Sequence, residues 1–193
     1  MSVISYLVVA LALGLVLMIQ MHRSAATAPA RPSARLLTVT LVATVHSALY
    51  LIGSAIGGWL QFRSDDGTMV YADRCAYVFL GLAAVVAVRA LWPYLGRRTQ
   101  PAVFRLDSAA QALLMAAATG MQLLLMGIGV GMADVAGHSI HLILWPLFVA
   151  ETLFGLLGIA YGRQQVKLRP RRWMAVAALL LVGVAVAAVV NAS

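Results

Sequence analysis

Residues 108–132 read SAAQALLMAAATGMQLLLMGIGVGM, a run of 25 residues without a charged side chain. A helix needs about 20 apolar residues to cross the roughly 30 Å hydrocarbon layer of a bilayer. The run is continuous rather than alternating, so it predicts a membrane-spanning α-helix and not a barrel strand. Five further runs have the same character. The six predicted spans are Val3–Met21, Leu36–Leu60, Cys75–Tyr94, Ser108–Met132, Ile140–Tyr161 and Trp173–Val190.

The composition of the whole chain agrees with this prediction. Of 193 residues, 63% are hydrophobic and 10% are charged, whereas a soluble domain carries roughly 25% charged residues. The longest break between spans, from His22 to Arg35, is too short for a soluble domain. The single cysteine, Cys75, excludes an internal disulfide and a Cys-based metal cluster. We expect one membrane domain over residues 1–193, with the first run retained as a helix because no basic residue precedes it.

Basic residues are divided unequally between the two sets of connections. Eleven lie in the connections after the first, third and fifth spans, and two in those after the second and fourth. The positive-inside rule then places the first set in the cytoplasm and both chain termini outside it. We therefore expect a multi-pass protein of a bacterial-type inner membrane. Because the arginines lie in short connections against a membrane, we do not expect nucleic acid as a partner.

Two internal matches predict a repeat. His46–Gly57 is echoed by Glu151–Gly162, and the first and fourth spans show a weaker echo. Since each half would contain three spans, the halves must run in opposite directions through the membrane, which is typical of secondary transporters. We expect two inverted three-helix repeats, about residues 1–95 and 106–193. The matched positions are Leu51, Gly53, Ala55 and Gly57 with Leu156, Gly158, Ala160 and Gly162, and Ala10, Ala12, Gly14 and Leu17 with Ala116, Ala118, Gly120 and Leu123.

Glycines in the spans predict close helix packing, since small residues let helix backbones approach in lipid. They recur at helical spacing in the second and fifth spans, as Gly53, Gly57 and Gly58, and as Gly155, Gly158 and Gly162. The fourth span ends in glycines at every second position, 127, 129 and 131. That spacing does not make one helix face, and it leaves open either tight packing or a loosened helix end.

Few polar side chains lie inside the spans, and they are the candidates for a site. Glu151 is the only acidic one, and His46 occupies the equivalent position of the other half. A carboxylate is costly in lipid and needs a partner, and histidine titrates near neutrality. We expect the two side chains to meet in the interior, near the axis between the halves. There they would form a cation site or a proton relay, or else a structural hydrogen bond that links the halves. Thr119 and Gln122, three residues apart, would share a helix face and join the pair, or tie helices together.

Several segments resemble a known family of exporters. They are Ala118–Gly127 (ATGMQLLLMG), Gly14–Met18 (GLVLM), and the trio His46, Tyr50 and Gly53. The pattern resembles the MntP-type manganese efflux pumps of the LysE-like exporter group. This resemblance implies six helices in two inverted repeats and efflux of Mn²⁺. Where the family carries two membrane aspartates, this chain has Val16 and Gln122, although Mn²⁺ prefers carboxylate ligands.

Three functional classes follow from the sequence, and the third, a membrane enzyme or electron carrier, is disfavoured for lack of ligands. The first is a small secondary transporter that exports a cation, with Mn²⁺ as one candidate, or another small solute. Its tentative ion site comprises Glu151, His46, Gln122 and Thr119. The second is a diverged, non-transporting subunit of a larger membrane complex, which the missing aspartates favour. We expect neither an enzyme nor a cofactor, because no phosphate loop, nucleophile triad or paired carboxylate occurs. The expected partners are the lipid bilayer, a small ion or solute, and a second copy or another membrane chain.

Overall fold

A computed structural model describes residues 3–27, 32–63, 69–95, 103–106, 108–133 and 139–190. All regular secondary structure in these ranges is helical, as the continuous apolar runs predicted. The helices are α1 (Val3–Thr27), α2 (Pro32–Arg63), α3 (Met69–Leu95), α4 (Ala109–Ala133), α5 (Ser139–Arg163) and α6 (Pro170–Val190).

The helices have apolar outer surfaces that suit a lipid environment. Five of them are long and apolar enough to cross a membrane, and α3 contributes a shorter apolar stretch, Tyr77–Pro93. Large hydrophobic side chains cover the outside of the bundle, where Leu179 is 72% exposed and Trp145 is 68% exposed. An exposed apolar surface of this kind would aggregate in water and marks a membrane interaction. The chain is therefore a multi-pass membrane protein.

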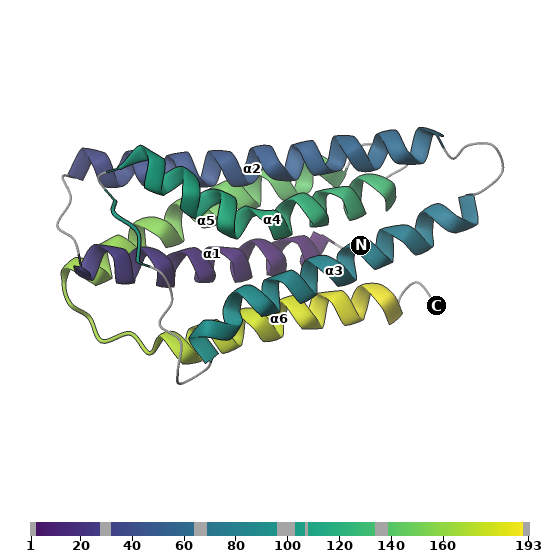
Figure 1. Cartoon of the computed structure of the whole chain (residues 1–193). Coiled ribbons are helices and arrows are strands. Elements are labelled where there is room, and N and C mark those ends of the chain that lie inside the picture. The colour runs from purple at the N-terminus through teal and green to yellow at the C-terminus, as the bar shows by residue number, and fades with distance from the viewer. Residues whose placement is uncertain are drawn as a thin grey trace.

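The helices run side by side, with successive helices in opposite directions (Figure 1). The closest pairings are α1 with α5 and α2 with α4. Helix α1 lies near the middle of the bundle, between α2, α4 and α5 on one side and α3 and α6 on the other. Helix α3 packs against α4 and α6, and α6 also packs against α1.

Glycines set the two closest helix pairings, as their spacing predicted. A Cβ atom on Gly53 would collide with the backbone carbonyl of Leu124 in α4, and one on Gly158 would collide with that of Met18 in α1. No side chain larger than hydrogen fits at these crossings. The backbones of the two helix pairs are thus in contact. Because lipid provides no hydrophobic driving force between helices, dispersion between the closely packed main-chain atoms stabilises these pairs instead. By contrast, a Cβ on Gly58 meets nothing within 4 Å.

The glycine-rich end of α4 is tightly packed and is not a loosened helix end. Helix α4 continues through the glycines at 127, 129 and 131 without a break. Gly127 contacts the carbonyl of Tyr50, and Gly131 contacts that of Ser54. Residues four apart share a helix face, so these two glycines form the α4 side of the α2–α4 crossing. Glycines occur at every second position here, but the two that line the crossing are four residues apart.

Several helices are longer than the apolar runs predicted. Helix α1 continues beyond Met21 to Thr27, and α2 begins at Pro32 instead of Leu36. Proline suits the first position of a helix, because the missing N–H would have no intrahelical partner there. Helices can continue past the hydrocarbon layer into the interface, where hydropathy no longer marks them.

Candidate ion site at the centre of the bundle

The centre of the bundle contains a buried pair of ionisable side chains. His46 comes from α2 and Glu151 from α5, and their exposed fractions are 3% and 1%. His46 Nδ1 lies 2.7 Å from Glu151 Oε1. The prediction that these two residues meet in the interior is confirmed. Both lie near the middle of their apolar spans, Pro32–Leu60 and Ile143–Arg163, so the contact would lie deep in the membrane.

Thr119 of α4 is the third member of the cluster. His46 Nε2 lies 2.9 Å from Thr119 Oγ1, and the Thr119 hydroxyl donates to the Met115 carbonyl at 2.7 Å. A threonine hydroxyl inside a helix often makes this bond to the preceding turn. Residues from three helices thus form one chain of hydrogen bonds, from Glu151 through His46 and Thr119 to the backbone of α4.

Gly120 gives the imidazole ring its room. A Cβ atom at this position would lie 3.2 Å from His46 Cδ2 and would collide with Leu49. Thr119 and Gly120 therefore act together, since one supplies the hydrogen-bond partner and the other the space. Sequence reasoning did not assign Gly120 to the site. The sequence did contain one signal, the match between Gly120 and Gly14. Gly14 lies at the crossing of α1 with α5, where an added Cβ atom would be 3.2 Å from the Ala150 carbonyl oxygen.

Gln122 is placed differently from the rest of the expected cluster. Its side chain lines an apolar pocket among residues of α1, α3, α4 and α6, and it is 8% exposed. Thr119 faces α2 instead. Of the four expected site residues, the structure joins His46, Glu151 and Thr119 by hydrogen bonds and places Gln122 among other helices.

One oxygen of the site stands apart from the hydrogen-bond chain. Glu151 Oε2 is buried and accepts no hydrogen bond from the residues that the structure describes. Leaving a buried polar atom unpaired costs about 1–3 kcal/mol, and more if the group is charged. The missing hydrogen bond would destabilise the folded protein more if the Glu151 carboxyl group were charged than if it were neutral.

The described residues contain no group of three His, Cys, Asp or Glu side chains close enough to hold a metal ion. The donors at this site are one carboxyl group, one imidazole and one hydroxyl. This set can bind and relay a proton as it stands. A divalent cation would need further oxygen ligands.

Comparisons of the chain with protein-family models, curated proteins and solved structures found no match. The geometry of the site is therefore what bears on function.

Proposed function

We propose that this protein is a small secondary transporter made of two inverted three-helix repeats, with His46 and Glu151 as its ion-binding element. The observation that carries the proposal is the 2.7 Å contact between these side chains at the centre of the bundle. Ionisable residues in the middle of a membrane are expensive, and they typically mark ion or substrate pathways. In inverted-repeat transporters the site lies near the midplane, where the repeats meet.

The helix crossings support the repeat. Gly53 contacts Leu124 across the α2–α4 crossing, and Gly158 contacts Met18 across the α5–α1 crossing. The two glycines are 105 positions apart in the sequence, and their partners are 106 apart. Exchanging α1 with α4, α2 with α5 and α3 with α6 turns the α2–α4 pairing into α5–α1 and the α3–α4 pairing into α6–α1, and it leaves the α2–α5 and α3–α6 pairings as they are. A two-fold relation between the halves predicts this correspondence.

The same relation puts the ion pair on the two-fold axis. His46 and Glu151 are 105 positions apart, so each occupies the place of the other in the opposite half. Residues that are equivalent and in contact must lie on the axis. The counterpart of Thr119, at the offset of 106, is Leu13, which has no hydroxyl group. The two halves therefore offer the pair different surroundings.

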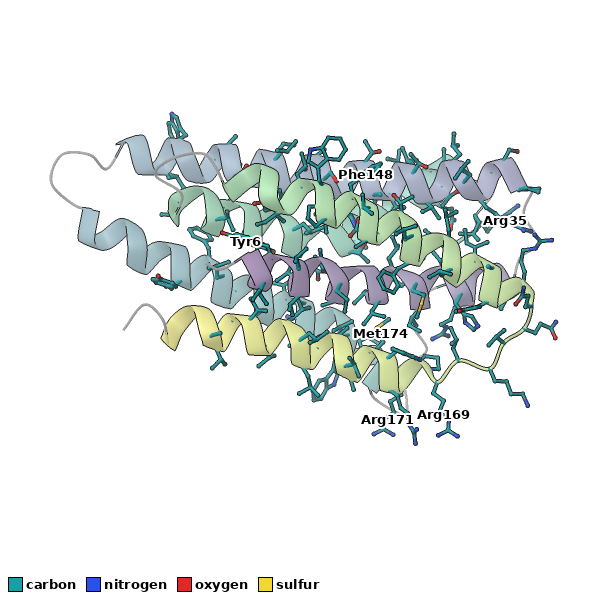
Figure 2. All side chains as sticks on the ribbon, turned by 180° about the vertical axis from the view of Figure 1, so that it is seen from behind. Tyr6, Arg35, Phe148, Arg169, Arg171 and Met174 are labelled. Carbon is teal, nitrogen blue, oxygen red and sulfur yellow. The ribbon has the colours of Figure 1, made fainter. Side chains whose placement is uncertain are left out.

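The proposal includes an orientation, with both termini outside the cytoplasm. Arg35, Arg169 and Arg171 lie toward one end of the bundle and Tyr6 toward the other (Figure 2). We expect single cysteines in the connections on either side, in a background with Cys75 replaced by alanine, to be labelled from opposite faces of the membrane. A cysteine at position 65, which lies outside the described residues, should react only from outside the cell. Its labelling only from the cytoplasm would reverse the orientation.

Transport itself is tested with purified protein in liposomes. Mn²⁺ is the first solute to test, because of the resemblance to manganese exporters, followed by Mg²⁺ and Ca²⁺. We expect a trapped metal-sensitive dye to report Mn²⁺ entry when a pH gradient is imposed, and Glu151→Gln to reduce the rate to that of protein-free liposomes. Thr44→Val serves as the control, since Thr44 is exposed and bonds only to the Thr40 carbonyl in its own helix.

If no cation enters faster than in protein-free liposomes, cation transport is the wrong function. The alternative, a non-transporting subunit of a membrane complex, would then be favoured. An exposed apolar groove between α3 and α6, lined by Gly81, Val85 and Val186 among others, offers such a subunit a surface for another helix.

A further inference from the structure

We propose that the ion held by the His46–Glu151 pair is a single proton, shared between Glu151 Oε1 and His46 Nδ1, and not a metal ion. This inference rests on the proposed function, because it names the ion that the transporter would use. It follows from counting hydrogen atoms along the hydrogen-bond chain.

The backbone fixes the direction of the chain at its far end. A carbonyl oxygen cannot donate, so the 2.7 Å contact between Thr119 Oγ1 and the Met115 carbonyl uses the hydroxyl hydrogen of Thr119. A hydroxyl has one hydrogen, so Thr119 Oγ1 must accept in its 2.9 Å contact with His46 Nε2. The Nε2 atom of His46 therefore carries a hydrogen.

This assignment leaves one proton for the contact between the two ionisable groups. If the imidazole is neutral, Nδ1 is an acceptor and Glu151 must be a protonated acid that donates from Oε1. If the proton has moved, Nδ1–H of an imidazolium donates to the carboxylate. The two arrangements contain the same atoms and have no net charge. A neutral pair suits a site whose residues are 3% and 1% exposed, since an isolated buried charge is strongly penalised.

The same count argues against a metal ion. Both nitrogens of His46 are engaged, one as a donor to Thr119 and the other with Glu151. Within the described part of the chain, Glu151 Oε2 is the polar side-chain atom of the pair that has no hydrogen-bond partner. Mn²⁺ and Mg²⁺ take oxygen ligands, about six for Mg²⁺ in octahedral geometry. A metal would have to break the chain before it could bind.

Loss of the proton would reverse the chain. The remaining hydrogen of the imidazole would move to Nδ1 and donate to the carboxylate, and Nε2 would become an acceptor. The Thr119 hydroxyl would then donate to Nε2 and leave the Met115 carbonyl. No atom other than hydrogen needs to move far. Thr119 is thus the residue that lets the pair exist with and without its proton.

Other ionisable groups on the surrounding helices add little charge near the pair. Helix α4 has none, and those of α1, α2 and α5 lie mostly toward the helix ends, apart from Tyr50, one turn from His46. They are Tyr6, His22 and Arg23 on α1, Arg35, Tyr50 and Arg63 on α2, and His141, Tyr161 and Arg163 on α5.

The sequence allows a clean test, because Glu151 is the only glutamate in the chain. Protein made with ¹³C-carboxyl glutamate and placed in lipid nanodiscs is titrated with base while its infrared difference spectrum is recorded. We expect the isotope-shifted carboxyl band of Glu151 and the imidazole bands of His46 to change together in one step. Thr119→Val should move that step along the pH scale, because Nε2 loses its partner in the proton-bound form and in the proton-free form. Thr44→Val should leave it in place.

Two results would overturn the proposal. One is a pair of separate steps, with the carboxyl and imidazole bands changing at different pH. The other is a shift of the Glu151 band when Mn²⁺ is added, with proton release that disappears in Glu151→Gln. The experiment uses no gradient and no transported solute, so its result stands whether or not the liposome assay detects transport.

Discussion

Replacing His46 with leucine is expected to lower the free energy of unfolding by about 1–3 kcal/mol, the range for leaving a buried polar group without its hydrogen-bond partner. Glu151 would keep its buried position, and its Oε1 atom would lose the partner 2.7 Å away. With Oε2 already unpaired, the whole carboxyl group would be buried without a hydrogen bond. Unfolding in mixed detergent micelles, followed by tryptophan fluorescence, measures the change.

The double variant separates a coupled pair from two independent residues. His46→Leu combined with Glu151→Leu leaves no unpaired polar group at the contact, so its cost should be smaller than the sum of the single costs by about 0.5–3 kcal/mol. Thr44→Val again provides a control that should change stability little, since it removes an exposed hydroxyl. If the single costs simply add, the two side chains are not coupled and the site has been assigned wrongly.

Alanine at two neighbouring glycines is expected to have opposite effects. A Cβ on Gly57 would collide with the Ile128 carbonyl and lie 2.8 Å from the Met132 nitrogen, and backbone atoms cannot move aside cheaply. We expect Gly57→Ala to cost about 1–3 kcal/mol, the usual range for overpacking. Gly58→Ala places its methyl group in open space, so it should be neutral or stabilise α2 by up to about 1 kcal/mol.

Both variants add the same methyl group to adjacent residues of one helix, so helix propensity cancels in the comparison. Thermal unfolding of the two proteins in the same detergent gives the difference. Equal stabilities would mean that α2 and α4 do not approach as closely as the structure has them.

Much of the fold followed from local pattern. The apolar runs located the helices, and the glycine spacing in α2 and α5 identified two faces that pack closely. The ends of the helices were less predictable, because α1 continues to Thr27 past the polar residues His22, Arg23 and Ser24. Hydropathy reports which residues prefer lipid, and a helix can be stable beyond that region through its own backbone hydrogen bonds.

The internal repeat predicted the His46–Glu151 part of the site, and the sequence predicted the rest of the site less well. The alignment of the halves paired His46 with Glu151, and the structure brings these two into contact. The same reasoning placed Thr119 and Gln122 together, because they are three residues apart. At about 3.6 residues per turn, such positions differ by about 60° around a helix. Helix α4 packs against α2 on one side and α3 on another, so this rotation is enough to give them different neighbours.

The central claim is that His46 and Glu151 meet inside the membrane, and solid-state NMR in lipid bilayers tests it most directly. With ¹³C-labelled glutamate and ¹⁵N-labelled histidine, the carboxyl carbon belongs to one residue and the imidazole nitrogens to four, and His46→Gln identifies the signals of His46. The structure predicts a strong dipolar correlation between the Glu151 carboxyl carbon and His46 Nδ1, whose contact with Oε1 is 2.7 Å. A Glu151 carboxyl carbon that correlates with no His46 nitrogen would contradict the account.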